Sequence, residues 1–403
     1  MVVDRQEAGE ASSGLHKQRS VLRLAVGGMI SLAVAMGIGR FVYTPLLPAL
    51  MDGLQLSPYD AGLIASANYV GYLVGAIVAA YGWAAGHERR MFILGLAGTT
   101  VLLAAMPLAQ SVATLSLIRF AAGVASAFVM IFGTTIVFSH FENQKRNGLQ
   151  AVHFGGVGLG LGFSALLLVA LIALNAHWAT GWYASAIIAF IGSVAAALLV
   201  GAEPVRDSDS HREPPLQWSR PLVLFIIAYG LFGLGYIVTA TFLVAIVRGD
   251  EGQTTLEGWV WFATGLAAGP SVWFWAPLRH RLGLILTFAI GCLVEAFGVT
   301  ASVLMPLPLG PFLGGILLGA TFVAVTAFGL NVGRMLAPQS RRRALAFMTA
   351  AFGTGQILGP LIAGYLANLS GNYTSGSLVA AMALVVAAGL AAMVKAHEPG
   401  TQS

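Results

Sequence analysis

Long, uninterrupted apolar runs are the feature that most limits how this chain can fold. Twelve of them follow one another along the 403 residues, separated by short polar connections. Each run approaches the ~20 apolar residues that cross the hydrocarbon core of a bilayer as a helix. Charged residues make up only 9% of the chain, whereas about a quarter is usual in a soluble domain. We therefore expect an all-α membrane protein, since a membrane β-barrel would show alternating rather than continuous hydrophobicity.

The runs fall into two sets of six on either side of one polar segment, GAEPVRDSDSHREPPLQWSR. The first six predicted spans lie near 22–51, 58–82, 91–109, 112–138, 148–174 and 180–201. The other six lie near 221–247, 257–278, 282–304, 309–337, 344–369 and 374–395. The predicted organisation is an N-terminal six-helix bundle over 1–201, a cytoplasmic linker over 202–219 and a C-terminal six-helix bundle over 220–403.

The two halves of the sequence also resemble each other. Shifting the first half by 196 residues places MGIGRFVYTPLLPAL on FGLGYIVTATFLVAI. Glycines then meet in pairs, namely Gly37 with Gly233, Gly39 with Gly235 and Gly62 with Gly258. A constant offset across several helices predicts two six-helix pseudo-repeats in parallel, as one large class of secondary transporters has.

The basic residues indicate how the chain lies across the membrane. With both termini in the cytoplasm, 17 of the 21 lysines and arginines fall on the cytoplasmic side, among them Lys17, Arg90, Lys145, Arg146, Arg206, Arg212, Arg342 and Lys395. Only Arg248 falls in a connection on the other side. The positive-inside rule requires this asymmetry. We expect a multi-pass protein of the cell (inner) membrane with both termini cytoplasmic, and the first run is too long for a signal-peptide core.

Several stretches resemble the major facilitator superfamily of transporters. GIGRFVYTPLLP, followed by SPYDAGLIASANYVGYLVGA, is similar to the YbfB/YjiJ-like branch of that superfamily. In IRFAAGVASA, Arg119 and Gly123 match the superfamily's motif of an arginine followed four residues later by a glycine. In the loop GWAAGHERR, Gly82 and Arg90 fit the usual pattern, but Gly86 stands where the family has an aspartate. The resemblance therefore does not carry over the gating ion pair attributed to that aspartate.

Arg40 and Arg119 lie inside apolar runs, where a charge is costly unless water, a partner or a ligand solvates it. Arg40 is about 11 residues, or roughly 16 Å, from the outer end of its run, and no acidic residue lies deep in an apolar run of the N-terminal half. We hypothesise that a small organic anion supplies the counter-charge. The alternatives are that the first helix ends early near Pro45 or Pro48, so that Arg40 reaches headgroups, and that Arg119 bonds carbonyls and braces its helix.

The predicted substrate-binding residues are the polar and aromatic side chains expected to line a cavity near the two arginines. They are Arg40, Tyr43, Thr44, Asn68, Tyr69, Arg119, Tyr236 and Gln356. The candidates for proton coupling are Glu295, the only acid deep in an apolar run, and His153. A bonded structural role is the alternative for both, and the family plan favours it for Glu295 by placing its helix in the outer support layer.

The resemblance implies alternating access with the substrate bound between the two bundles. The predicted function is a secondary active transporter of a small organic anion, coupled to protons. Multidrug-type efflux of amphipathic compounds and a transport-inactive membrane sensor are the alternatives. No Walker-type phosphate loop and no catalytic or metal-binding cluster occurs in the sequence, so we expect neither an enzyme nor a cofactor or metal. The expected partners are a small-molecule substrate and the lipid bilayer, with no nucleic acid, and the chain is expected to be a monomer.

Overall fold

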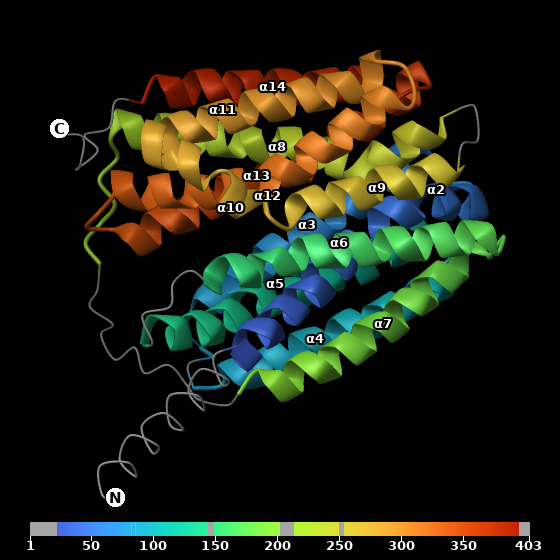
Figure 1. Cartoon of the computed structure of the whole chain (residues 1–403), viewed down its shortest axis with the longest axis horizontal. Helices are drawn as coiled ribbons and strands as arrows, with labels where there is room; N and C mark the ends of the chain where they lie inside the picture. Colours follow the sequence, from blue (N-terminus) through green and yellow to red (C-terminus); the bar gives the residue numbers. More distant parts are fainter. Residues whose placement is uncertain are drawn as a thin grey trace, which may run out of the picture.

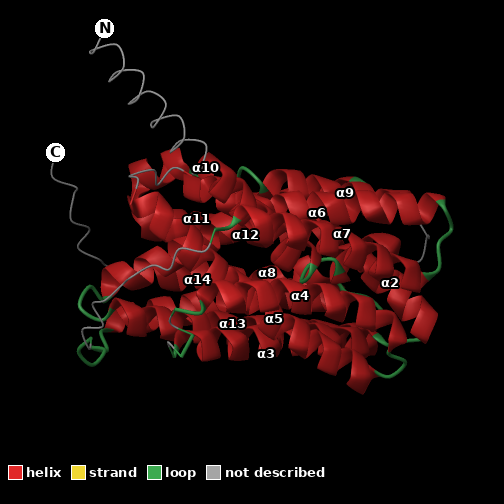
Figure 2. Cartoon of the chain, turned by 90° about the horizontal axis from the view of Figure 1, so that it is seen from below, coloured by secondary structure: helices red, strands yellow, loops and turns green. Residues whose placement is uncertain are grey.

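The computed structural model describes residues 22–81, 83–84, 86–143, 149–201, 213–249 and 254–394. All regular secondary structure in these ranges is helical, as Figure 2 shows. Eleven helices within them are long and apolar enough to cross a membrane. The expectation of an all-α membrane protein is therefore confirmed. Several basic residues used to predict the orientation lie outside the described ranges, namely Lys17, Lys145, Arg146, Arg206, Arg212 and Lys395.

The helices before the polar segment begin with one long span, Leu22–Leu54, which contains the π-helix η1 (Ala33–Ile38) and α2 (Tyr43–Leu54). The helices that follow are α3 (Pro58–Ala80), α4 (Glu88–Ala105), the short 3₁₀ turn η2 (Met106–Leu108), α5 (Val112–Asn143), α6 (Gln150–Ala173) and α7 (Trp178–Leu199). We call them the N-terminal helices; they form the lower part of Figure 1.

The C-terminal helices form the upper part of Figure 1. They are α8 (Arg220–Arg248), α9 (Thr254–Ala268), α10 (Ser271–Phe274), α11 (Ala276–Leu304), α12 (Leu309–Leu336), α13 (Arg341–Ser370) and α14 (Thr374–Ala392). The continuous span expected near 257–278 is wrong in detail, because the helix is interrupted between α9 and α10 at Gly269 and Pro270. Pro270 has no N–H, and its ring clashes with the carbonyl of a continuing helix. Helix α11 begins at Ala276 but is broken at Gly283, whose φ is 77°, so its long segment after this break corresponds to the span expected near 282–304.

The two sets of helices meet chiefly along three pairs: α3 with α13, α6 with α9, and α2 with α8. Glycines let backbones approach closely at these contacts, as small residues do between membrane helices. A Cβ on Gly265 of α9 would lie 2.6 Å from the backbone nitrogen of Gly162 on α6. A Cβ on Gly62 of α3 would collide with the carbonyl oxygen of Pro360 on α13. Any site between the two sets therefore lies between closely packed helices.

The last helix, α14, ends toward the left of Figure 1. The ends of α2 and α8 and the turn between α13 and α14 lie at the right. We call this right-hand end of the molecule the distal end. The first half of α3 starts there, after a capping box in which Ser57 Oγ accepts from the Asp60 N–H at 3.1 Å. This cap fixes the turn between α2 and α3.

Candidate substrate site between the two sets of helices

The first span is not a regular helix at the depth where its one arginine lies. The N–H groups of Gly39 and Phe41 bond carbonyls five residues earlier, at 2.7 and 3.1 Å. The Thr44 N–H then bonds the Phe41 carbonyl at 3.2 Å, and Pro45 has no N–H to offer. Among the described residues, no backbone N–H bonds the carbonyls of Gly39 and Arg40. The break in the helix thus leaves two buried acceptors for a side chain.

Arg119 of α5 fills both of these acceptors. Its Nη1 donates to the Gly39 carbonyl at 3.0 Å and its Nη2 to the Arg40 carbonyl at 2.9 Å, and the residue is only 2% exposed. Its guanidinium carbon lies 5.0 Å from the centre of the Tyr43 ring. Asn68 Nδ2 donates to the carbonyl of Arg119 at 2.9 Å. Of the two roles that the sequence left open for Arg119, this conformation has it bracing the interrupted helix.

Arg40 lies between the two sets of helices and is 3% exposed. Its Nη2 donates to Gln356 Oε1 on α13 at 2.9 Å. The guanidinium carbon lies 4.7 Å from the centre of the Tyr69 ring and 4.4 Å from that of Tyr72, both on α3. Its Nε has no hydrogen-bond partner among the described residues. The guanidinium is therefore held against two aromatic faces with one buried donor unused.

The alternative in which the first helix ends early is wrong. Helix α2 continues to Leu54 with Pro48 inside it, because the neighbouring helices pack around the segment and bury it. Arg40 therefore lies in the break between η1 and α2, inside the long first span, and not at the end of that span, where a long side chain could reach lipid headgroups.

Gln356 links Arg40 to Tyr236 of α8, since Gln356 Nε2 donates to the Tyr236 hydroxyl. We call Arg40, Gln356 and Tyr236 the central bridge. The Tyr236 ring lies nearly parallel to Phe322 and Phe352, with centroid distances of 5.9 and 5.6 Å and interplanar angles of 8° and 14°. Stacked aromatic rings of the C-terminal helices therefore border the site.

Further contacts join the two sets near the central bridge. The hydroxyls of Tyr69 and Thr241 lie 3.2 Å apart, and Thr44 Oγ1 donates to the carbonyl of Ala240. The structure therefore brings five of the eight predicted residues to the contact between the sets, namely Arg40, Thr44, Tyr69, Tyr236 and Gln356. The other three bond within the N-terminal helices, namely Tyr43, Asn68 and Arg119.

The two arginines give this region an uncompensated positive charge. Neither Arg40 nor Arg119 forms an ion pair with a described residue, whereas Arg248 pairs with Asp52 and Glu257. Carbonyls and an amide oxygen solvate the two guanidinium groups instead. A buried charge without an opposite charge is costly, so an anion that enters this region gains attraction from both groups.

Glu295 forms its hydrogen bond outside the central bridge, with the residue next to Phe322. It is fully buried in α11, and its Oε2 is 2.9 Å from the Thr321 hydroxyl of α12. Thr321 Oγ1 also lies 2.6 Å from the Leu317 carbonyl, and a hydroxyl has only one proton to donate. Helix α11 packs on α12 and α14. The carboxyl group is thus enclosed among the C-terminal helices.

His153 is also buried away from the central bridge. Its Nε2 lies 3.1 Å from the Thr134 hydroxyl of α5. Its ring makes edge contacts with Phe138 and Phe154, each at a centroid distance of 5.4 Å. Its surroundings are those of a packed core side chain within the N-terminal helices.

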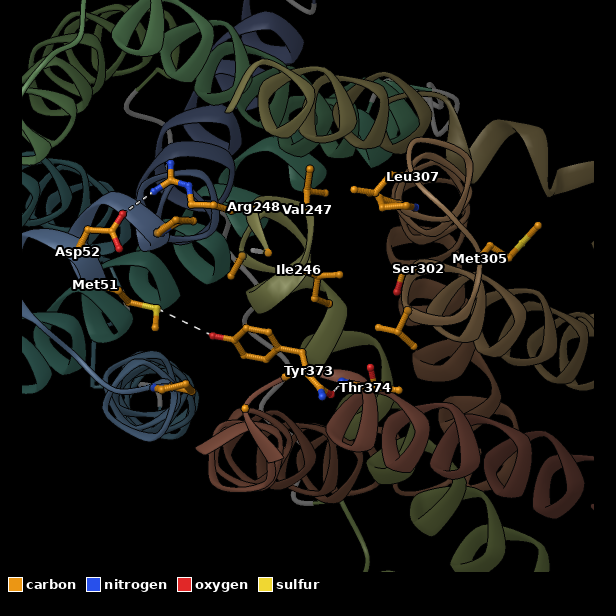
Figure 3. A pocket seen from close by; sticks show the side chains of 18 residues that line it. Met51, Asp52, Ile246, Val247, Arg248, Ser302, Met305, Leu307, Tyr373 and Thr374 are labelled. Atoms are coloured by element: carbon orange, nitrogen blue, oxygen red, sulfur yellow. Dashed lines mark hydrogen bonds and ion pairs between the residues drawn. The ribbon is translucent and has the colours of Figure 1, made fainter. Parts of the chain in front are cut away.

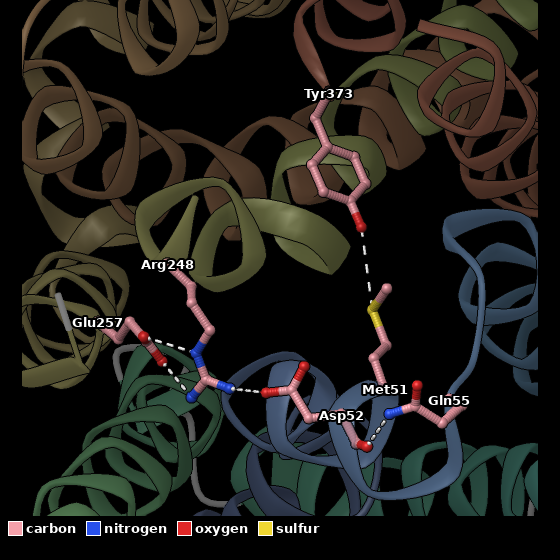
Figure 4. A network of polar contacts seen from close by, with 6 residues as sticks. All are labelled: Met51, Asp52, Gln55, Arg248, Glu257 and Tyr373. Carbon is pink, nitrogen blue, oxygen red and sulfur yellow. Dashed lines mark hydrogen bonds and ion pairs between the residues drawn. The ribbon is translucent and has the colours of Figure 1, made fainter. Parts of the chain in front are cut away.

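A second polar cluster, at the distal end, was not singled out from the sequence. Arg248 at the end of α8 donates through Nη1 to Asp52 Oδ2 of α2 at 3.0 Å. Its Nε and Nη2 donate to the two oxygens of Glu257 on α9, at 2.8 and 2.9 Å, as Figure 4 shows. We call these three residues the distal network. It joins the two sets of helices through one arginine.

One signal in the sequence could have located this network. Asp52 and Arg248 are 196 residues apart, which is the offset that aligns the two halves of the sequence. Thr44 and the residue that it bonds, Ala240, are separated by the same 196 residues. Positions that are equivalent under the repeat therefore contact each other along α2 and α8.

A pocket of about 440 Å³ opens beside the distal network. Figure 3 shows the Tyr373 ring pointing across it toward Met51, with the hydroxyl 3.9 Å from the sulfur. Burial raises the pKa of the Tyr373 phenol, so the hydroxyl remains a donor at neutral pH. None of the eight predicted substrate-binding residues lines this pocket. The distal pocket and the central bridge are separate places along the contact between the two sets.

A family model described as "Uncharacterised MFS-type transporter YbfB" matches residues 32–392 of the sequence. That match covers most of the chain, including the central bridge and the distal network. The chain belongs to this family of MFS-type transporters. The resemblance to the major facilitator superfamily and its YbfB-like branch is therefore confirmed.

A curated relative, the "Uncharacterized MFS-type transporter YceJ" of Bacillus subtilis (strain 168), is 26% identical over 352 residues, which cover 83% of this chain and 87% of that protein. Among solved structures, the nucleoside transporter NupG matches with a TM-score of 0.70 at 16% identity, covering 93% of this chain and 99% of that one. An inward-facing bacterial homolog of the human lysosomal transporter Spinster matches with a TM-score of 0.70 at 15% identity, covering 94% of this chain and 96% of that one. These structures share the transporter fold, and the descriptions are of membrane transporters rather than enzymes.

Proposed function

We propose that this transporter carries a small organic anion between the N-terminal and C-terminal helices, with Arg40 as its anion-binding group. The observation that carries the proposal is the environment of Arg40. Its guanidinium is buried between the two sets, pairs with no described carboxylate and has a donor without a partner. A carboxylate or similar group there would gain a charge-assisted hydrogen bond.

Alternating access requires two bodies that rock against each other around the bound solute. The 196-residue offset between the two halves of the sequence supports two equivalent bodies. Shifting α3 by 196 residues gives 254–276, which includes α9 and α10, and shifting α6 gives 346–369, which lies within α13. The α3–α13 contact and the α9–α6 contact are therefore equivalent: the 196-residue shift carries α3 onto α9 and α6 onto α13. In the proposed arrangement α9 and α10 together form the interrupted twelfth span, and the two sets are six-helix pseudo-repeats.

The orientation and the coupling ion also belong to the proposal. The basic residues support an inner-membrane protein with both termini cytoplasmic. Proton coupling rests on Glu295, whose buried carboxyl has one oxygen without a partner among the described residues. The chain is proposed to work as a monomer.

Counterflow in proteoliposomes tests the anion site. A panel of labelled organic acids identifies the exchanged solute, and Arg40→Gln is then compared with the wild type. We expect Arg40→Gln to reduce exchange at least tenfold, whereas Arg334→Gln, which changes an exposed arginine near the end of α12, leaves it unchanged. Exchange of an anion that persists in Arg40→Gln contradicts the proposed site.

Multidrug-type efflux is a second candidate because aromatic rings surround the central bridge. Neutral and cationic amphipathic compounds would then exchange as well as anions do, and Arg40→Gln would leave their exchange intact. A membrane sensor would bind its ligand without exchanging label.

A further inference from the structure

Gln356 occupies one of the two donors on the edge of Arg40 that suits a carboxylate. The Nε–H and an Nη2–H of a guanidinium point in parallel and can bind both oxygens of one carboxylate. In Arg40 the Nη2 donates to Gln356 Oε1 at 2.9 Å, and the Nε has no partner among the described residues. The Gln356 amide offers one acceptor oxygen and so fills one of these two donors, whereas a carboxylate offers two oxygens and can fill both.

Only one of the two arginines at the site is free to bind an anionic group, so we expect the ligand to carry one such group. Both terminal nitrogens of Arg119 already bond carbonyls of the interrupted first helix. Taking Arg119 away from these carbonyls would leave two buried acceptors without donors, which is costly. Arg119 Nε also has no partner among the described residues, but its Nη2 is held by the Arg40 carbonyl, so Arg40 is the guanidinium that can offer two donors to a carboxylate.

The rest of the ligand has to lie among aromatic rings. Tyr69 and Tyr72 flank the guanidinium on the side of α3. Phe322 and Phe352 stack on Tyr236 on the opposite side. Aromatic groups pack favourably against such faces, whereas a second anionic group would lose its hydration and would find the other guanidinium, Arg119, already bonded to carbonyls.

We propose that Gln356 is an internal substitute for the substrate's carboxylate, and that the substrate is a monocarboxylate with an aromatic body. On binding, the carboxylate takes the Nε and Nη2 of Arg40, and the Gln356 amide moves away. This refines the function proposed above and depends on it. It makes Gln356 a competitor of the substrate as well as a link between the two sets of helices.

Competition has a measurable consequence. A ligand that must displace an internal group has an apparent dissociation constant equal to its intrinsic one divided by the fraction of time that the site is free. Removing Gln356 Oε1 should therefore strengthen binding, whereas most substitutions in a binding site weaken it. With the amide in place about nine-tenths of the time, Gln356→Ala would tighten binding about tenfold. Gln356→Glu places a permanent carboxylate beside Arg40 and should prevent binding.

The test uses the purified full-length protein and benzoate as the probe, with dissociation constants taken from the rise of the thermal unfolding midpoint with ligand concentration. Benzyl alcohol, cyclohexanecarboxylate and phthalate serve as the neutral, non-aromatic and dianionic comparators. Ser66→Ala is the matched control variant, because Ser66 Oγ also donates across the contact between the two sets, to the Ile357 carbonyl at 2.8 Å, without touching Arg40.

We expect the wild type and Ser66→Ala to bind benzoate more tightly than any comparator, Gln356→Ala to bind it about tenfold more tightly still, and Gln356→Glu not to bind it. Weaker or unchanged binding in Gln356→Ala overturns the competition, and so does normal binding in Gln356→Glu. Should Gln356→Glu fail to fold, the titration of Gln356→Ala decides alone. Exchange of another anion that requires Arg40, without benzoate binding in the wild type, overturns the aromatic monocarboxylate while leaving the proposed function intact.

Discussion

In the distal network one arginine pairs with two carboxylates that lie on different sets of helices. Removing either carboxylate should therefore have a different effect. Asp52 belongs to α2 and Glu257 to α9, while Arg248 belongs to α8. The Asp52 side chain is 75% exposed and that of Glu257 is fully buried. Asp52→Asn thus weakens a link between the two sets, whereas Glu257→Gln weakens a link within the C-terminal helices.

The expected magnitudes follow from the exposure of each pair. The exposed Arg248–Asp52 pair is worth about 0.5–1 kcal/mol, so Asp52→Asn should raise the ratio of open to closed distal ends about two- to fivefold. Glu257 makes two hydrogen bonds to Arg248 in a buried position. Glu257→Gln should cost about 2 kcal/mol of stability without a large change in that ratio.

Spin-label distance measurements separate the two effects. Labels on cysteines introduced at Leu174 and Leu309, both exposed, would report on the distal ends of the two sets, and the native Cys292 is buried. We expect a larger long-distance population in Asp52→Asn and a lower thermal unfolding midpoint in Glu257→Gln. An unchanged distance distribution in Asp52→Asn, or equal opening in both variants, refutes the assignment of the distal network as a link between the sets.

Two further predictions concern buried groups away from the contact. Arg119→Leu leaves the carbonyls of Gly39 and Arg40 without donors, so we expect a loss of about 3 kcal/mol in stability, seen as a lower midpoint in thermal size-exclusion chromatography; an unchanged midpoint contradicts the bracing role. Glu295→Gln preserves the shape of the side chain, so we expect normal stability and anion exchange but no accumulation driven by a pH gradient. Accumulation equal to that of the wild type would exclude Glu295 as the proton carrier.

The membrane fold and the family could be predicted from the sequence because hydropathy and a few motifs determine them. That Arg40 has a specific, enclosed environment was also predictable, since a charge in an apolar run needs one; its role in binding remains a prediction. The interruption at Pro270 was missed because mean hydropathy does not register a missing N–H, although a Gly-Pro pair is a known signal for a break. The role of Arg119 remained open because it depends on the π-helix, which frees two carbonyls on a different helix.

The distal network was not recognised because it joins Asp52 of α2 to a residue 196 positions later in the sequence. Hydropathy places Asp52, Arg248 and Glu257 near helix ends but does not say which of them meet. The identity of the partner of Arg40 was equally hidden, since Gln356 is 316 residues away. Such contacts follow from tertiary packing, and a single sequence carries only the repeat offset as a hint of them.

The contact between Asp52 and Arg248 has a consequence for how the two halves of the gene could diverge. Under the proposed two-repeat arrangement these positions are equivalent, so in a dimer of two identical six-helix ancestors each residue would face its own copy. Two aspartates or two arginines at that place would repel each other. Joining the two halves in one chain lets the two positions carry opposite charges, as Asp52 and Arg248 do, so that a repulsive self-contact is replaced by an attractive one.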